Sequence, residues 1–460
     1  MTQQGVRWSA DQVLALAPDA ASRKAGSKLG AAGPWSGAGS CEEGTVEEGT
    51  VEEGTVWGLC KGSGSKPYQT IVDIADPAGP AYKCSCPSRK FPCKHALGLL
   101  LLWAGGDDAV PTVEQAPDWA EQWIAGRRKR AGEERPAGGG SSAAADPEAA
   151  RRRAEKRAER VTAGATELEQ RLTDLLRGGL AGAEQSGYGL WEETAARMVD
   201  AQAPGLATRV RELGAIPASG PGWPVRLLEE CALLHLLDQG WLHRDRLPEG
   251  LAATVRSRIG LPASADGPPV RDRWLVLAQY DTVDAKLTTR RIWLHGADSG
   301  RTALLLSYGA AGRAPELALP VGLALGAELS AYPGAGRHRA ALGERFAAPA
   351  PLSIRPPGVP TAQAAARYGE ALREDPWLES VPVTLGRVVP VPDGDSWQLA
   401  DAETEFALPL SPVARSRPGL WRLVALSGGA PVTVFGECGH HGFTPLTAWP
   451  EGTGEAVPLC

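Results

Sequence analysis

Long hydrophobic runs are absent from this sequence of 460 residues. A helix needs about 18 or more consecutive apolar residues to cross a bilayer, and no such stretch occurs. The opening residues, Met1–Gly5, are polar and no hydrophobic segment follows them, so the pattern of a secretory signal peptide is missing too. These absences argue against a membrane span and predict a cytoplasmic location.

Recognisable catalytic motifs are also missing. The sequence has no Gly-x-Ser-x-Gly nucleophile elbow and no dinucleotide-binding fingerprint. The glycines and serines of Gly62–Lys66 lack the spacing of a phosphate-binding loop. We therefore expect a protein that is not an enzyme.

An excess of positive charge is lacking as well, because 48 Lys and Arg face 54 Asp and Glu, for a net charge of −6. This balance argues against nucleic-acid affinity along the whole chain. Residues 126–160 are a local exception, with eleven basic and six acidic side chains. That segment could follow a phosphate backbone. Its alternating Arg and Glu equally fit a solvated helix face with i,i+4 ion pairs.

Eight cysteines are present, and four residues of metal-ligating type lie within one short segment, Cys84-Ser85-Cys86-(six residues)-Cys93-Lys94-His95. In a reducing compartment, clustered cysteines bind metal more often than they form disulfides. Cys and His in such sets hold Zn²⁺ tetrahedrally, and four protein ligands leave no open position for catalysis. The segment predicts one structural zinc ion bound by Cys84, Cys86, Cys93 and His95.

The flanking sequence is compatible with this geometry. Residues 82–86 read as the end of a strand, where side chains two apart point to the same face, so both thiolates can face one ion. Cys93 and His95 precede an apolar run, residues 96–103, which predicts a buried helix. A helix N-terminus favours thiolate over thiol, and thiolate is the form that binds metal.

This pattern resembles the SWIM zinc finger, and specifically bacterial SWIM zinc finger proteins, over residues 57–104. The resemblance implies a small zinc-stabilised ββα finger. It also implies a non-catalytic protein-interaction or adaptor role, with a MoxR-type AAA+ ATPase and a von Willebrand factor A domain protein as expected partners. The alternative is DNA or other nucleic-acid binding through the finger and the basic segment.

Along the chain, the fold class is predicted to be α+β. A finger-bearing region at 1–130 precedes a flexible linker at 131–146, rich in Gly, Ser and Ala. A helical region at 147–262 and a β-rich C-terminal region at 270–460 complete the map. Within the last region the sequence predicts one helix at 361–373 and, among its strands, one at 421–426.

Two further segments allow more than one interpretation. Glu-Glu-Gly-Thr-Val occurs three times in tandem over residues 42–56, and its period of five matches neither helix nor strand, which predicts an acidic surface loop. Cys438, His440 and His441 offer three ligands for a second metal, although a fourth is lacking nearby and a turn without metal is the favoured interpretation. The other cysteines are expected to be free or buried thiols.

Overall fold

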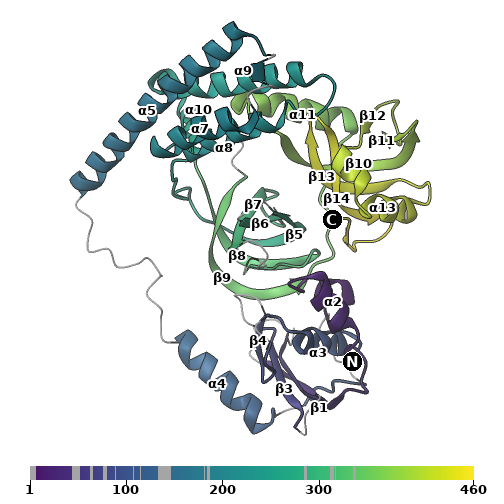
Figure 1. Cartoon of the computed structure of the whole chain (residues 1–460). Coiled ribbons are helices and arrows are strands. Elements are labelled where there is room, and N and C mark those ends of the chain that lie inside the picture. Colours follow the sequence, from purple (N-terminus) through teal and green to yellow (C-terminus); the bar gives the residue numbers. More distant parts are fainter. Residues whose placement is uncertain are drawn as a thin grey trace.

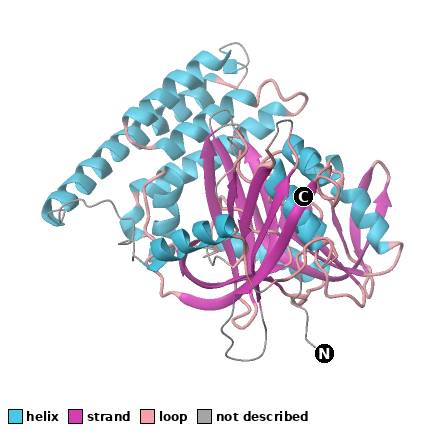
Figure 2. Cartoon of the chain, turned by 90° about the horizontal axis from the view of Figure 1, so that it is seen from below, coloured by secondary structure: helices cyan, strands magenta, loops and turns pink. Residues whose placement is uncertain are grey.

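A computed structural model shows three regions assembled into one molecule, with the finger-bearing unit at one end and a helical bundle at the other (Figure 1). Two antiparallel sheets lie beside and between them, and Figure 2 shows the helices of the bundle gathered on one side of the strands. Among the described helices, none has both the length and the hydropathy to span a membrane. The structure describes residues 7–43, 52–62, 66–75, 80–88, 90–106, 108–113, 115–132, 147–180, 182–183, 187–283, 287–310, 315, 317–334 and 338–460.

The finger-bearing unit is a four-stranded antiparallel sheet in the order β1-β2-β3-β4, packed against helix α3. Eight of the 11 residues of α3 are buried, which explains why its sequence is uniformly apolar rather than amphipathic. The predicted ββα unit is present as β3, β4 and α3, and two more strands extend it. The elements are α1 (Ala10–Leu14), α2 (Ala20–Ser27), β1 (Trp35–Glu43), β2 (Glu52–Cys60), β3 (Tyr68–Asp73), β4 (Ala81–Cys84), α3 (Lys94–Ala104) and α4 (Asp118–Gly132).

The tandem repeat is not simply a loop, and the prediction for its ends was wrong. Glu42 lies opposite Glu53 in the antiparallel pairing of β1 with β2, so the first and third copies both contribute to strands. Val56, the last residue of the third copy, is completely buried. The third copy continues directly into residues 57–60 as part of the same strand, β2. Strand pairing depends on backbone hydrogen bonds, so it includes the third copy whatever the period of the repeat. Residues 44–51 lie outside the described residues, as do 133–146 of the predicted linker.

Helix α2 is held against α3 by glycines that allow close backbone approach. A Cβ atom on Gly26 would lie 2.8 Å from Cβ of Leu97, and one on Gly98 would lie 2.5 Å from Cβ of Leu29. Gly26 of α2 therefore receives a leucine of α3, and Gly98 of α3 receives Leu29, which follows the end of α2. This reciprocal fit places α2 in a single position beside the finger.

Replacing Gly98 by Ala is expected to destabilise this packing by about 1–3 kcal/mol, the usual cost of overfilling a core. The higher helix propensity of Ala offsets at most about 1 kcal/mol of that loss. Hydrogen exchange of the amides in α3 of the zinc-loaded protein measures the effect. Gly126→Ala is the matched control, because Gly126 lies in α4 with no atom within 4 Å of the new methyl group. Equal protection in Gly98→Ala and the unaltered protein would contradict the packing described here.

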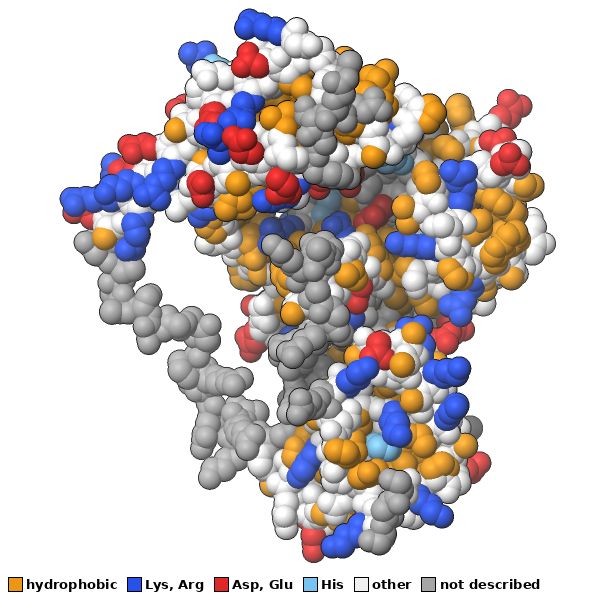
Figure 3. All heavy atoms as spheres, in the orientation of Figure 1, with side chains coloured by type: hydrophobic (Ala, Val, Ile, Leu, Met, Phe, Trp, Pro, Cys, Tyr) orange, Lys and Arg blue, Asp and Glu red, His pale blue; other side chains and the backbone are white. Residues whose placement is uncertain are grey.

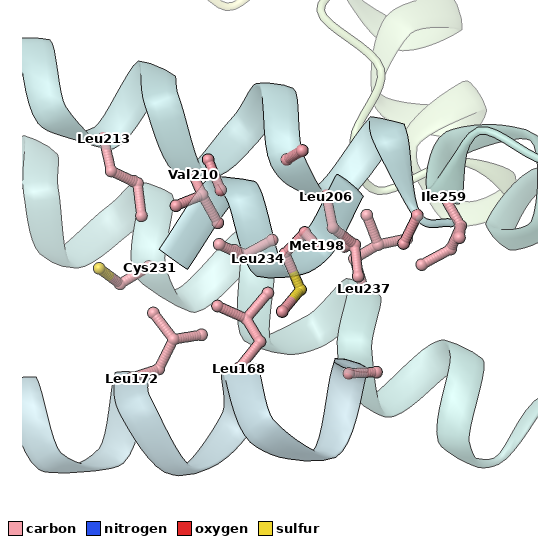
Figure 4. Packing of buried hydrophobic residues seen from close by; sticks show 14 of the residues in the cluster. Leu168, Leu172, Met198, Leu206, Val210, Leu213, Cys231, Leu234, Leu237 and Ile259 are labelled. Carbon is pink, nitrogen blue, oxygen red and sulfur yellow. The ribbon is translucent and has the colours of Figure 1, made fainter. Parts of the chain in front are cut away.

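The helical bundle forms around one hydrophobic core, to which five helices contribute buried side chains (Figure 4). Leu168 of α5, Met198 of α7 and Leu206 of α8 are among the largest fully buried side chains. The first turns of α5, by contrast, project from the bundle and are exposed (Figure 1). The elements are α5 (Pro147–Gly178), α7 (Gly187–Asp200), α8 (Pro204–Ala215), α9 (Trp223–Leu242), the short 3₁₀ helix η1 (Arg244–Arg246) and α10 (Glu249–Ile259).

One acidic group is enclosed in this bundle. Asp238 of α9 is 0% exposed, and neither of its carboxylate oxygens has a hydrogen-bond partner among the described residues. Burial raises the pKa of Asp238 to about 8, and the neighbouring Glu169 carboxylate adds to the rise. The unfolded chain would hold this group near its ordinary pKa of about 4, so folding takes up a proton between these values.

The bundle should therefore lose stability as pH rises from about 5 to about 8, because the unfolded state binds fewer protons than the folded state there. Asp238→Asn removes the titrating group and should flatten this dependence. Denaturant unfolding at several pH values measures the slope. Asp245→Asn, an exposed residue of η1, serves as the control. Identical slopes for Asp238→Asn and the unaltered protein would show that Asp238 is ionised in the folded state.

The C-terminal region contains two antiparallel sheets with a shared apolar contact. The five-stranded sheet has the order β7-β6-β5-β8-β9, and the six-stranded sheet has the order β12-β11-β10-β13-β14-β15. Leu275 and Leu277 of the first sheet pack with Phe435 and Trp449 of the second. The first sheet comprises β5 (Val270–Val283), β6 (Leu287–Gly296), β7 (Thr302–Ala310), β8 (Leu323–Ala331) and β9 (Ala340–Pro351).

The six-stranded sheet carries the remaining helices. Its strands are β10 (Ser380–Asp393), β11 (Ser396–Asp401), β12 (Ala407–Pro409), β13 (Val432–Gly439), β14 (Gly442–Pro450) and β15 (Val457–Pro458), and its helices are α11 (Thr361–Glu374), α12 (Pro412–Ser416) and α13 (Gly419–Ser427). The predicted helix at 361–373 is confirmed, whereas the predicted strand at 421–426 was wrong. Leu420 and Leu423 lie one helical turn apart and are both buried, while Trp421 is 64% exposed. A helix places both leucines on its buried face, whereas a strand would place them on opposite faces.

Contacts between the regions are specific. Trp377, which follows α11, is buried in the core of the helical bundle and donates a hydrogen bond from Nε1 to the Leu233 carbonyl at 2.8 Å. Beside it, Arg258 of α10 holds Asp375 with hydrogen bonds of 2.9 and 2.5 Å. At the other end of the molecule, Leu323 of β8 is part of the core of the finger-bearing unit. The C-terminal region thus supplies side chains to both other cores.

Candidate metal centre

The four predicted ligands come from two elements that meet at one point. Cys84 is the last residue of β4, Cys86 follows two positions later, Cys93 is the N-cap of α3 and His95 lies in the first turn of that helix. One ligand atom from each residue lies within 4.8 Å of every other. Bonds to zinc of about 2.1–2.3 Å bring tetrahedral ligand atoms about 3.5–3.8 Å apart, so a small inward movement completes the site. The separation of 3.7 Å between Cys84 Sγ and His95 Nδ1 already has this value.

Backbone pairing orients the strand side of the site. Cys84 lies opposite Thr70 of β3, and the hydroxyl of Thr70 is 3.3 Å from Cys84 Sγ. Immediately beyond, the Ser85 amide donates to the Gln69 carbonyl, and the Gln69 amide donates to the Ser85 hydroxyl. These bonds continue the hairpin past the strand end, so the direction of the chain between the two cysteines is fixed.

The helix side of the site is buried. Cys93 is 1% exposed and His95 is 5% exposed, and the ring of Tyr68 lies 4.9 Å from the ring of His95. Cys93 accepts the first helical hydrogen bond through its carbonyl, from Leu97, but its side chain makes no capping bond. The thiol at the positive end of the helix is therefore available to a metal ion.

The thiols influence one another electrostatically. A hydrogen bond from Cys84 lowers the pKa of Cys93, and the same bond raises the pKa of Cys84 to about 11. Burial raises the pKa of Cys86. Without a bound metal ion, the sulfur atoms of these three cysteines therefore retain protons. A divalent cation must displace these protons to bind. Cys₃His coordination with a buried histidine fits zinc, whose preferred ligands are thiolate and imidazole nitrogen.

The other candidate ligands are placed elsewhere. Cys438 is buried in the core of the six-stranded sheet, while the ring of His440 contacts the hydroxyl of Tyr368 at 3.1 Å. Within the described part of the chain, one group of three or more Cys, His, Asp or Glu residues could hold a metal ion, and it consists of Cys84, Cys86, Cys93 and His95. Of the remaining cysteines, Cys60, Cys231, Cys438 and Cys460 are free thiols, as predicted, and Cys41 is in no disulfide.

The basic segment is partly neutralised where its side chains are described. Arg151 pairs with Glu155 and Arg152 pairs with Glu148, both four residues apart on the exposed start of α5. This arrangement favours the solvated-face interpretation for these two arginines. The side chains of 127–130 lie outside the described residues.

Sequence reasoning missed one feature of the site. A hollow of about 570 Å³ lies between α2 and the metal-binding loop, and Cys86, Cys93 and His95 line it together with residues of α2. Helix α2 ends 57 residues before Cys84, the first ligand. The motif therefore contains no local indication that this helix forms a wall of the site.

Comparison with protein-family models gives two matches. Residues 71–104 match the SWIM zinc finger, and residues 156–259 match the SWIM-associated four-helix bundle domain. Comparison with the curated proteins and with the solved structures found no match. The chain therefore carries a SWIM zinc finger and a SWIM-associated four-helix bundle domain, and the Cys₃His set of the finger is arranged to hold one structural zinc ion.

Purified protein should contain one zinc ion per chain, and Cys84→Ser should reduce the zinc content to near zero, because a weaker ligand replaces one of four. Elemental analysis after gel filtration measures the ratio. Cys231→Ser, which alters a buried thiol in the helical bundle, is the control and should retain zinc. Stoichiometric zinc in a Cys84→Ser/Cys93→Ser double variant would place the site elsewhere in the chain.

Proposed function

We propose that this protein is a non-catalytic interaction or adaptor protein, in which the zinc finger presents a rigid surface to a protein partner. The observation that carries the proposal is the ligand set itself. Cys84, Cys86, Cys93 and His95 fill all four positions of a tetrahedral ion, so no position remains for substrate or activated water. Zinc in such a site stabilises a fold rather than performing chemistry.

The charge distribution around the finger supports an interaction surface. Figure 3 shows Lys and Arg side chains spread over the finger end of the molecule, with few acidic side chains among them. Exposed Lys24, Lys28, Lys61 and Lys94 all lie on or beside the elements that meet at the metal centre. In a chain with net negative charge, this segregation provides a local surface for an acidic partner.

The partner that we propose belongs to a system of a MoxR-type AAA+ ATPase and a von Willebrand factor A domain protein, on the resemblance stated above. Affinity purification of the tagged chain from its native host, followed by mass spectrometry, tests this proposal. We expect such proteins to co-purify with the unaltered chain and with Cys231→Ser, and to be lost with Cys84→Ser. Equal recovery of the same proteins with Cys84→Ser would exclude the finger as the contact.

Nucleic-acid binding is the second candidate, favoured by the same lysine-rich surface and by the exposed start of α5. Phosphate contacts release counterions, so any DNA affinity of this kind must fall steeply as salt rises. Fluorescence anisotropy with labelled duplex DNA at several salt concentrations distinguishes the candidates. Tight, steeply salt-dependent binding together with no co-purifying protein would favour nucleic acid over the adaptor role.

A further inference from the structure

The hollow beside the metal centre has the dimensions of a binding site. Its volume of about 570 Å³ falls within the range of about 300–1,000 Å³ that is typical of ligand pockets. Apolar side chains of α2 form one wall, and the ring of Tyr68 and the metal ligands form the floor. The lining residues are Ala21, Ser22, Ala25, Leu29, Lys61, Gly62, Tyr68, Cys86, Pro87, Ser88, Lys90, Cys93, Lys94 and His95.

Both walls of the hollow are held in place. The glycine contacts described above fix α2 against α3, and Lys90 of the metal-binding loop bonds to Asp19, the N-cap of α2, at 2.6 Å. That hydrogen bond from Lys90 lowers the pKa of Asp19 to about 2, with help from the Ser22 amide. The hollow is thus formed before any ligand arrives, which reduces the entropy lost on binding.

The charge at the rim is positive and partly uncompensated. Lys61 and Lys94 are exposed, line the hollow, and make no ion pair with any residue that the structure describes. Asp19, the acidic side chain beside them, is already engaged by Lys90 and by the Ser22 amide. Two cations at the mouth of an apolar hollow select a ligand that carries both carboxylates and apolar groups.

The shape decides between the two macromolecular sources of negative charge. A DNA duplex carries its phosphates on a convex surface, which cannot enter a concave pocket, and lysine offers a point charge rather than the bidentate fork that reads base edges. An extended peptide can place a small apolar side chain in the hollow while neighbouring carboxylates reach the rim.

Resting on the proposed adaptor function, we infer that this hollow binds an acidic peptide segment of the partner protein, through Lys61 and Lys94 at the rim and the apolar wall of α2. Because Cys86, Cys93 and His95 form its floor, zinc coordination and peptide binding depend on the same backbone. Zinc loss should therefore abolish the site, whereas loss of rim charge should weaken peptide binding without affecting zinc content.

Selection from a displayed random-peptide library on the zinc-loaded full chain provides the probe. The inference predicts recovered peptides enriched in Asp and Glu around a small apolar residue. Lys61→Glu and Lys94→Glu should each weaken the binding of a selected peptide by about tenfold or more, measured by fluorescence anisotropy, while zinc content stays unchanged. Arg23→Glu is the matched control, because this exposed arginine of α2 makes the same charge change without lining the hollow.

Peptides without acidic enrichment, or peptides whose affinity is the same in Lys61→Glu, Lys94→Glu and Arg23→Glu, would overturn the inference. Duplex DNA that binds the unaltered chain, loses affinity in the two rim variants and displaces the selected peptides would overturn it in favour of nucleic acid. These failures are distinct from failure of the adaptor role, since native partners could still co-purify through another surface of the finger.

Discussion

Coordination of one zinc ion is the constraint on which the finger-bearing unit depends. The ligands join the end of β4 to the beginning of α3, and no disulfide performs this task, since none of the eight cysteines is in a disulfide. A unit of this size buries a limited apolar surface, so metal binding contributes folding free energy directly. The negative charge of three thiolates against one divalent cation is offset in part by the positive end of α3.

The other regions are connected to this unit, and to one another, through a small number of buried contacts. Leu323 of β8 enters the core of the finger-bearing unit, and Trp377 enters the core of the helical bundle. The pair of Arg258 and Asp375 adds a two-pronged ionic contact beside the tryptophan. Such contacts make the C-terminal sheets the central scaffold that places the finger and the bundle at opposite ends (Figure 1).

This arrangement leaves the outer surface of the finger accessible. The lysines named above are exposed, and every residue that lines the hollow belongs to the finger-bearing unit rather than to the C-terminal sheets. The scaffold therefore carries the finger without covering its metal centre. An adaptor requires such a division, in which one part of the chain provides rigidity and another provides contact.

The local sequence was enough to predict those elements in which the spacing of apolar residues matches the face that is buried. Helix α11 and the long helix α5 were predictable because the spacing of their apolar residues is a local signal that acts within a few residues. The segment around Trp421 was misread as a strand because a short apolar run has no decisive period until one knows which side chains the core receives. Strand β8 and strand β9 are rich in Ala and Gly, and their β structure follows from pairing with neighbours rather than from propensity.

The metal ligands were determined by the sequence alone, because all four lie within twelve residues and strand and helix geometry bring them together. The hollow beside them was decided by tertiary structure. It exists because Gly26 and Gly98 let α2 approach α3. A glycine allows such an approach only where another segment packs against it, and the sequence does not say which segment that is. The spacing of residues along the chain is enough to specify a ligand set. A pocket between segments that are distant in the sequence forms only when those segments pack together in the tertiary structure.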